Sequence, residues 1–290
     1  MNSSNKPVIL SLKIGDQLTT ISCGHVMVEL IKFIAYQKRQ IPYPYQWLKQ
    51  VITKKKSCED REGEHAKDSF QSERHFRVAS TALENLDFIL KGLQKEINGH
   101  SIPEEVCIAL GATPVSLKEV YRVLLPAACH QPQCHSTLIA NDQIIHRSVF
   151  RTLATSEKLS QYFYQQLQPT NLYVFIKKKL VNNQDTVLDN DNFVLSNGCR
   201  IPQNAKIVVL DLRSKTFDNL ACCNEFKIFG DSGYQSLQNL QLEDSDENDD
   251  DFHEIESTDS VQWYQSSYVM KGFKDCYING SSITDAWLNA

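Results

Sequence analysis

Apolar residues recur at helical spacing over several stretches in the first half of the chain. From Phe76 to Ile97 they return every third or fourth position, and Asn98-Gly99 follows. This spacing gathers the apolar side chains on one face of a helix, and an Asn-Gly pair commonly ends one. The pattern therefore predicts an amphipathic helix that ends at these two residues.

The first predicted helix carries a polar residue within its apolar stripe. We expect it to run from Ser22, as its N-cap, to about Gln40, because Pro42 disfavours a helical residue before it. The stripe consists of Val26, Leu30, Phe33 and Ile34. Steps of about 100° per residue place Gln37 in its middle. Either Gln37 is buried with its hydrogen bonds satisfied, or the stripe extends past the core and Gln37 contacts another protein.

A third helix is predicted from about residue 141 to residue 159, with an aromatic residue on its flank. Its core stripe consists of Ile145, Val149, Thr152 and Leu153. Phe150 lies roughly 100° from the centre of that stripe and precedes Arg151. An aromatic residue beside an arginine is the composition of a protein-interaction hot spot. The alternative, that Phe150 packs under a neighbouring loop, fits the pattern equally well.

Short apolar runs separated by polar turns dominate the second half of the chain and are typical of strands. Strands are predicted at 8–14, 104–112, 172–179, 193–195, 206–212, 225–229 and 262–273. The run at 104–112 is continuously apolar after its two glutamates and suits the middle of a sheet. Ser116 and Glu119 have the spacing of a capping box and predict a helical turn. Helices first and strands later favour an α+β fold, with three main helices on one face of a mainly antiparallel sheet.

Two charged stretches are expected to be mobile insertions in a single domain spanning residues 1–290. After a short helical piece at 43–52, the chain is charged and poor in aliphatic residues over 54–75. A second insertion, expected at 235–258, contains the run 243–256, which holds nine acidic residues and no Lys or Arg. Such a run is most often a solvated loop kept open by self-repulsion, although it could recruit a basic partner.

Charge and cysteine usage narrow the class of protein. The formal net charge of −5 becomes +4 once the nine acidic residues of that run are excluded, so no strongly basic nucleic-acid surface is indicated. Nine cysteines without regular spacing favour reduced thiols. The sequence has no apolar stretch of the ~20 residues that span a bilayer. We therefore expect a cytosolic or nuclear protein that binds neither nucleic acid nor membrane.

Two motifs suggest a metal site and a catalytic nucleophile, but neither is specific enough to predict one. The first is a metal-like cluster of Cys129, His130, Cys134 and His135. Thiolates and imidazoles suit zinc, but the spacing is loose and no second ligand pair stands out, so a variable loop is the favoured interpretation. The second is GDSG at 230–233, similar to a protease nucleophile turn around Ser232, but Tyr234 and Gln235 follow where that turn has Gly-Pro. We expect no enzyme, no metal and no cofactor.

Four segments, in the same order, resemble one known family. They are ELIKFIAYQKRQIPYPYQWLKQ (29–50), VCIALGATPVSLKEVY (106–121), CRIPQNAKIVVLDL (199–212) and WYQSSYVMKGFK (263–274). The first resembles an apolar helix that runs into Tyr-Gln, a basic residue and a Pro-x-Pro-Tyr turn, and the last resembles a strand with Lys-Gly-Phe. The chain is thus similar to the Comet family, binding proteins of the spindle-checkpoint protein mitotic arrest deficient two.

The resemblance implies a HORMA-like fold in which a C-terminal segment wraps the domain like a seat belt. It also implies a non-enzymatic adaptor, a monomer that forms a heterodimer with the closed conformer of its partner. With a Pch-type AAA+ ATPase, similar to thyroid hormone receptor interactor thirteen, such an adaptor dismantles the mitotic checkpoint complex and silences the spindle assembly checkpoint. The implied location is the nucleus and cytoplasm, and the spindle or kinetochore during mitosis.

The resemblance also assigns roles to single positions. The partner-facing Gln of the Tyr-Gln pair and the Phe before Arg on the third helix correspond to Gln37 and Phe150, and Lys38 and Arg151 beside them could make rim contacts. Phe193 matches part of a segment thought to dock the ATPase, but in this chain's version of it, NFVLSN at 192–197, Leu195-Ser196 replace the family's Pro-Lys pair. A second hypothesis is a HORMA-like module whose seat belt captures a peptide from a different client.

Overall fold

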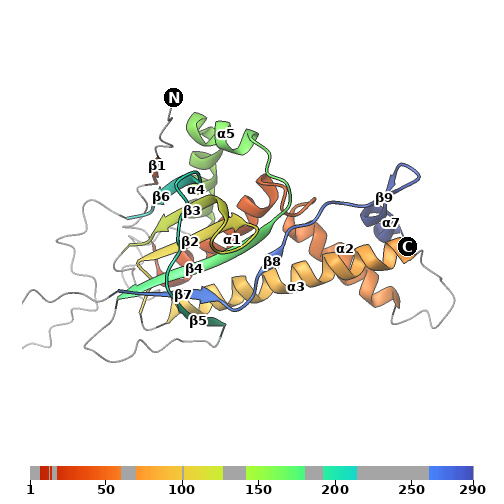
Figure 1. Cartoon of the computed structure of the whole chain (residues 1–290), viewed down its shortest axis with the longest axis horizontal. Helices are drawn as coiled ribbons and strands as arrows, with labels where there is room; N and C mark the ends of the chain where they lie inside the picture. Colours follow the sequence, from red (N-terminus) through yellow and green to blue (C-terminus); the bar gives the residue numbers. More distant parts are fainter. Residues whose placement is uncertain are drawn as a thin grey trace, which may run out of the picture.

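The computed structural model describes residues 7–12, 14, 18–59, 70–99, 101–126, 142–179, 192–213 and 261–289. Its helices are α1 Thr20–Gln37, α2 Tyr45–Glu59, α3 Phe70–Asn98, α4 Asp142–Thr155, α5 Glu157–Tyr164 and α7 Ile283–Asn289. Its strands are β1 Val8–Ser11, β2 Glu105–Gly111, β3 Leu117–Leu124, β4 Asn171–Lys179, β5 Phe193–Ser196, β6 Lys206–Asp211, β7 Val261–Ser266, β8 Met270–Lys271, β9 Tyr277–Ile278 and β10 Ser281–Ser282. Figure 1 shows their arrangement.

The main sheet has the strand order β1-β6-β3-β2-β4-β7-β5, and β8 also pairs with β4. The pairs formed by β2, β4, β5 and β7 are antiparallel, while β6 is parallel to both β1 and β3. Strand β2 is buried along its whole length in the middle of the sheet, as its uninterrupted apolar run predicts. The expected α+β class and mainly antiparallel sheet are thus confirmed.

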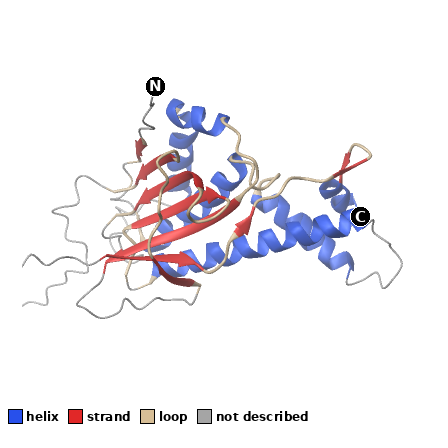
Figure 2. Cartoon of the chain, viewed as in Figure 1, coloured by secondary structure: helices blue, strands red, loops and turns tan. Residues whose placement is uncertain are grey.

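The two faces of the sheet are covered differently, and Figure 2 shows the helices gathered on one of them. On this helical face, alternate residues of β2, β3 and β4 join the apolar stripes of the helices in one large core. On the opposite, outer face, the side chains between them form a smaller core. Because side chains alternate along a strand, each central strand contributes to both cores. Helix–sheet packing of this kind is compatible with the expected HORMA-like fold.

The predicted helices are present, with different ends. The helix predicted over 76–97 is α3, which ends at Asn98 as expected. In α1 the N-cap is Thr19, not Ser22: the Thr19 Oγ1 accepts from the Ser22 amide at 3.0 Å, and the Ser22 hydroxyl accepts from the Thr19 amide at 2.8 Å. The helix predicted over 141–159 is divided into α4 and α5 at Ser156, whose side chain caps α5.

The helical turn predicted at Ser116 is wrong. Ser116 lies in the turn between β2 and β3, where its hydroxyl accepts from the Thr113 amide at 3.1 Å. The next residues form β3, and Glu119 is buried within it. The turn is so tight that a Cβ on Gly111 would lie 2.5 Å from the Ser116 carbonyl oxygen. Spacing alone could not distinguish this turn from a capping box, since the same short polar residues serve both.

The mobile insertion expected at 54–75 is largely helical at its two ends. The short helical piece predicted at 43–52 continues as α2 to residue 59, and α3 begins at residue 70. The start of α3 is held by distant contacts, since the Trp287 indole donates to Ser72 at 3.1 Å and stacks on His75. The residues between the two helices, and the whole insertion expected at 235–258, lie outside the described residues, as does the strand predicted at 225–229.

The C-terminal segment, residues 261–289, runs along the molecule from the sheet to the helices. Strand β7 pairs with β4 and β5, after which the chain passes beside α3 to β9, β10 and α7 (Figure 1). Met270 and Phe273 are buried along the way, and α7 packs on α2, while its buried Trp287 contacts His75 and Phe76 of α3. This segment therefore closes one side of the structure with its own apolar side chains.

Candidate partner-binding surface

The C-terminal end of α1 presents two neighbouring polar residues in different directions. Gln37 is exposed, whereas Lys38 is fully buried. Successive helical residues point about 100° apart, so the buried stripe that contains Ile31 and Ile34 continues at Lys38 and leaves Gln37 outside. Of the two interpretations of Gln37, burial with satisfied hydrogen bonds is wrong, and exposure at the end of the helix is what the structure shows.

Lys38 is a structural residue, and the expectation that it makes a rim contact is wrong. Its ammonium lies 2.9 Å from the Glu119 carboxylate on β3. It also donates to the backbone oxygens of Tyr162 at 2.9 Å and Gln165 at 2.7 Å. A buried charge is tolerated only when it is paired and hydrogen-bonded, and this network meets that requirement. Lys38 therefore holds the end of α5 and the following residues against α1.

The buried amide expected at Gln37 is found three residues later, at Gln40, which the sequence pattern did not reveal. Gln40 Nε2 donates to the Lys38 oxygen at 2.7 Å, and its Oε1 accepts from the Thr170 amide at 2.7 Å. Its backbone oxygen accepts from the Phe273 amide at 3.0 Å. These bonds join the end of α1 to the segment before β4 and to the C-terminal segment. Gln40 thereby fixes the position from which Gln37 projects.

Phe150 lies on α4 beside α1, half-buried, with Arg151 exposed next to it. Its ring makes an edge contact with Phe33, at 5.5 Å between centroids, and a second with His146 at 6.4 Å. Phe33 lies one helical turn before Gln37, on the same side of α1. The structure thus connects the elements that carry Gln37 and Phe150 through one shared aromatic residue.

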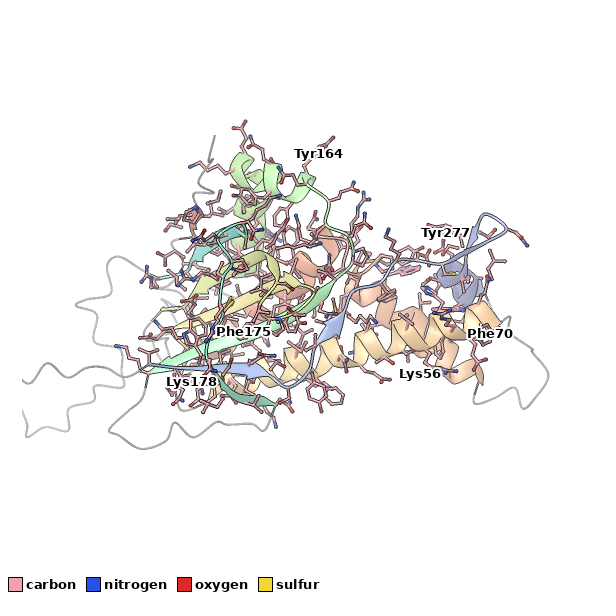
Figure 3. The ribbon with its side chains drawn as sticks, viewed as in Figure 1. Lys56, Phe70, Tyr164, Phe175, Lys178 and Tyr277 are labelled. Atoms are coloured by element: carbon pink, nitrogen blue, oxygen red, sulfur yellow. The ribbon has the colours of Figure 1, made fainter. Side chains whose placement is uncertain are left out.

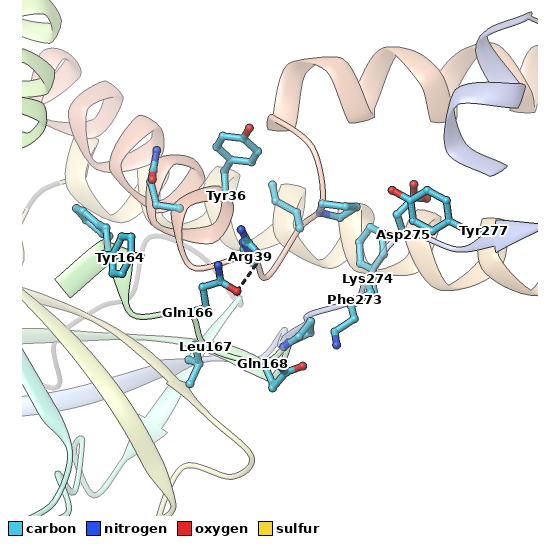
Figure 4. A pocket seen from close by; sticks show the side chains of 15 residues that line it. Tyr36, Arg39, Tyr164, Gln166, Leu167, Gln168, Phe273, Lys274, Asp275 and Tyr277 are labelled. Atoms are coloured by element: carbon cyan, nitrogen blue, oxygen red, sulfur yellow. Dashed lines mark hydrogen bonds between the residues drawn. The ribbon is translucent and has the colours of Figure 1, made fainter. Parts of the chain in front are cut away.

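A groove of about 1030 Å³ opens next to Gln37, between α1, the residues after α5 and the C-terminal segment. Three exposed tyrosines stand around it: Tyr36 at 40%, Tyr164 at 87% and Tyr277 at 63% exposure. Figure 4 shows the Arg39 guanidinium donating across the groove to the Gln166 side chain, at 2.8 Å. Figure 3 shows Tyr164 and Tyr277 at the molecular periphery. Sequence reasoning missed these groove residues, because they come from three separate segments.

Asp275 organises the C-terminal wall of this groove. Its carboxylate accepts hydrogen bonds from the Tyr43 hydroxyl at 2.9 Å and the Thr284 hydroxyl at 2.6 Å. His75 Nε2 lies 3.4 Å from the same carboxylate and 3.1 Å from the Thr284 hydroxyl. We call Tyr43, His75, Asp275 and Thr284 the C-terminal clasp. It joins the residues after α1, the start of α3 and the C-terminal segment.

The clasp shifts the pKa values of its members. Burial raises the pKa of Asp275, but hydrogen bonds from Ser282, Thr284 and Tyr43 together outweigh it and hold that pKa below the ordinary value. Burial lowers the pKa of His75, against the opposing pull of the Asp275 carboxylate. Burial is also the largest cause that raises the pKa of Tyr43 to about 12. Near neutral pH the clasp therefore contains a carboxylate and a neutral imidazole.

Phe193 does not lie on an accessible surface, and its assignment as an ATPase contact is wrong. Its side chain is 2% exposed at the start of β5, inside the core on the helical face. The next two residues, Val194 and Leu195, are 50% and 65% exposed on this edge strand. Resemblance of residue type identified a core position here, because an aromatic residue in a strand packs inward as readily as it binds a partner.

The remaining candidates for chemistry gain no support from the described residues. The Cys129 to His135 cluster, Ser232 and the acidic run 243–256 lie outside them. Within the described ranges, no group of three or more His, Cys, Asp or Glu could hold a metal ion. None of the helices that the structure describes is long and apolar enough to cross a membrane.

Comparison with known proteins places this surface in context. A family model described as "p31comet: Mad1 and Cdc20-bound-Mad2 binding" matches residues 6–173. The "MAD2L1-binding protein" of Mus musculus is 32% identical over 101 residues, which is 35% of this chain and 36% of the mouse protein. The chain thus aligns with about a third of that relative's length. The matched range 6–173 contains Gln37 and Phe150 and excludes Phe193 and the C-terminal segment.

Proposed function

Since this chain belongs to the p31comet family, whose model spans more than half of its length, we propose that it binds the closed conformer of mitotic arrest deficient two. The family description and the name of the mouse relative both refer to proteins that bind Mad2 or MAD2L1. In this proposal the chain is a non-enzymatic adaptor and a monomer that forms a heterodimer with its partner.

One observation carries the proposal: Gln37 is exposed beside a groove, and Phe150 lies on the adjacent helix. Gln37 lies on α1 and Phe150 on α4, and these two helices pack on each other. Phe33 of α1 contacts the Phe150 ring, so both residues lie on the same side of the molecule. Two residues 113 positions apart in the sequence are thus available to one partner. The resemblance assigns partner contacts to these same two positions.

Gln37 suits recognition of another polypeptide. A primary amide offers two donors and one acceptor with two lone pairs, so it can bond to both backbone groups of a partner segment. Leaving such groups unpaired in a closed interface costs about 1 to 3 kcal/mol. Gln37 therefore discriminates between a partner that satisfies the amide and one that buries it without a bond.

Phe150 suits the role of an anchor. Its contacts with Phe33 and His146 restrict the ring before any partner arrives, so little side-chain entropy is lost on binding. The exposed Arg151 beside it can form a rim contact with a carboxylate, which sets the rate of association more than the affinity. The aromatic anchor and the amide thus supply affinity and specificity respectively.

We further propose that the C-terminal segment acts as a seat belt that is closed on its own chain. The support is its path along the sheet and α3, with Met270 and Phe273 buried against the domain. This arrangement disfavours the alternative function, a module that captures a client peptide, because the chain's own side chains occupy the space beneath the segment. A peptide recovered from beneath residues 260–275 after purification would favour the alternative.

We also propose that the adaptor cooperates with a Pch-type AAA+ ATPase to disassemble the mitotic checkpoint complex and silence the spindle assembly checkpoint. The resemblance to the Comet family supports this step. The proposed location follows from it: nucleus and cytoplasm, and the spindle or kinetochore during mitosis. Buried Phe193 contributes to β5 in this scheme, and the ATPase is contacted elsewhere.

The proposal is tested by substituting the two residues and measuring binding to the closed conformer. We expect Gln37→Glu to place a charge where an amide is needed, and Phe150→Ala to remove the anchor. Each change is expected to cost roughly 2 kcal/mol, or about a 30-fold rise in Kd by calorimetric titration. Because Gln37 is exposed, the circular dichroism spectrum and the Tm of Gln37→Glu should change little.

Matched controls come from other faces of the chain. Gln50 is exposed on α2, and Phe88 is 43% exposed on α3, where it stacks on Tyr268. The variants Gln50→Glu and Phe88→Ala make the same chemical changes away from the surface and should leave Kd within about twofold, since single surface changes are close to neutral. Unchanged affinity in the Gln37→Glu, Phe150→Ala double variant would show that the partner binds elsewhere.

A further inference from the structure

Two free cysteines meet on the outer face of the sheet, away from the partner-binding surface. Cys107 is fully buried in the central strand β2, and Cys199 is half-buried in the segment between β5 and β6. Their side chains share a hydrogen bond and belong to the outer-face core. They are 92 residues apart in the sequence, so only the fold brings them together.

The topology of the sheet explains why Cys199 reaches this place. Strands β5 and β6 point in the same direction but lie on opposite sides of β2 in the strand order. Parallel strands require a connection that crosses the sheet, and Figure 1 shows this crossover segment, residues 197–205, passing over the sheet. Ile201, two residues after Cys199, also packs into the outer-face core.

The turn before Cys199 is built for close packing. Gly198 has a φ of 87°, a left-handed conformation that favours glycine. A Cβ at this position would lie 3.1 Å from the Trp263 ring. The glycine therefore allows the crossover segment to lie directly on Trp263 of β7, and the next residue is Cys199. Its position over β2 is thus set by the backbone.

An ion pair between Arg122 and Glu105 lies beside the two thiols. Arg122 on β3 is the direct cross-strand neighbour of Cys107, so its side chain emerges on the same face. Its guanidinium binds both oxygens of Glu105, at 2.5 and 2.8 Å. The hydrogen bond from Cys107 is the largest cause that lowers the pKa of Cys199; burial and the Glu105 carboxylate oppose it, and Arg122 adds only a smaller lowering contribution. The same bond and burial raise the pKa of Cys107. Cys199 is also the more exposed of the two thiols, since Cys107 is fully buried, so it takes the role of nucleophile in the proposal below and Cys107 that of resolving thiol.

We propose that Cys107 and Cys199 form a reversible disulfide when the protein meets hydrogen peroxide. The Cys199 thiolate attacks one peroxide oxygen, the O–O bond breaks, and a sulfenic acid and hydroxide result; the hydroxide takes a proton to become water. The Cys107 sulfur then attacks the sulfenic sulfur. The S–S bond forms, the S–O bond breaks, and the leaving hydroxide takes the Cys107 proton. One peroxide oxidises two thiols and yields two molecules of water.

The disulfide would fasten the crossover segment to the central strand of the sheet. Gln37 and Phe150 belong to helices on the opposite face, so oxidation leaves their surface in place. The crossover segment, by contrast, loses the freedom to lift from the sheet, because its half-buried cysteine becomes covalently bound to β2. The expected readout is slower amide exchange over 199–205 in the oxidised protein.

Peptide mapping of the full-length protein tests the proposal. The protein is treated with hydrogen peroxide, its remaining thiols are alkylated, and digestion under non-reducing conditions is followed by mass spectrometry. We expect a peptide pair joined through Cys107 and Cys199 that lacks two hydrogen atoms and separates on reduction. Cys199→Ser should abolish this pair, while Cys276→Ser, a change at another half-buried free cysteine, should leave it intact.

Two results would overturn the proposal. One is oxidation of Cys199 to a sulfinic acid, or its alkylation, while Cys107 remains a thiol. The other is a disulfide-linked peptide pair that contains Cys107 in the Cys199→Ser variant, which would show that Cys107 reacts with a different cysteine. Because Cys199 is half-buried and serine has nearly its shape, Tm of the Cys199→Ser variant verifies that the fold is retained during the test.

Discussion

Gln37 and Lys38 adjoin in the sequence, yet one is exposed and the other is fully buried. The exposure of Gln37 follows from helical geometry once the buried side of α1 is known. The burial of Lys38 does not, because it depends on Glu119, whose strand was itself mistaken for a helical turn. Residue-type resemblance identified Gln37, Phe150 and Arg151 at accessible or half-accessible positions, but could not separate these from Lys38 and Phe193, which serve the fold.

Removing the Lys38 side chain should destabilise the protein more than it affects binding directly. Lys38→Ala leaves the Glu119 carboxylate buried without its cation, a loss we expect to be about 3 to 5 kcal/mol in urea unfolding. Replacing both partners, as in Lys38→Met with Glu119→Leu, should recover most of that free energy. A Lys38→Ala variant that is as stable as the wild type but binds its partner less well would contradict the structural role of Lys38 and support a rim contact instead.

At the scale of the elements, apolar periodicity located the helices and strands, and polar contacts decided where they end. The positions of α3 and β2 follow from local pattern alone. The ends of α1 and α2 do not: the cap lies at Thr19 instead of Ser22, and α2 continues into lysine-rich sequence. In α2 one of those lysines pairs with Glu84 of α3, at 2.5 Å. Short capping residues and charged helix faces look alike in a sequence until their partners are known.

The capping box at the start of α1 should contribute measurably to stability. Thr19→Ala removes the hydroxyl that accepts from the Ser22 amide and donates to the Ser22 hydroxyl, while the Thr19 amide keeps its own bond, and we expect a loss of about 1 kcal/mol in urea unfolding. Thr81→Ala, at an exposed position within α3, provides the matched change and should stay within about 0.5 kcal/mol of the wild type. Equal effects of the two variants would mean that Ser22 or another residue caps the helix.

At the scale of the whole molecule, the C-terminal segment is held in place by contacts with residues from the first third of the chain. The C-terminal clasp joins Tyr43 and His75 to Asp275 and Thr284, which lie at least 200 residues later in the sequence. The α+β class was predictable from the order of helical and strand-like patterns. The parallel pairing of β6 and the groove beside Gln37 were not, because they arise from segments that no local pattern connects.

The clasp should make stability depend on pH. His75 has a lowered pKa in the folded protein, so the unfolded chain binds the proton more readily as the pH falls below about 6.5. The free energy of unfolding is therefore expected to decrease below that pH. The lowered pKa of Asp275 adds a second decrease as the pH falls below its unfolded value of 3.8.

Urea unfolding at a series of pH values separates the contribution of His75. His75→Gln should flatten the decrease between about pH 7 and about pH 5, because it removes the imidazole whose pKa is lowered in the folded protein. A wild-type free energy of unfolding that rises over this interval as the pH falls would contradict the assigned direction of the His75 shift.

The most direct test of the proposed function is a titration of the full-length protein against separately prepared open and closed conformers of mitotic arrest deficient two. We expect saturable binding to the closed conformer, weakened about 30-fold by Gln37→Glu, and binding to the open conformer that is at least ten times weaker. Equal affinity for the two conformers, or binding to the closed conformer that Gln37→Glu and Phe150→Ala leave unchanged, would contradict the account.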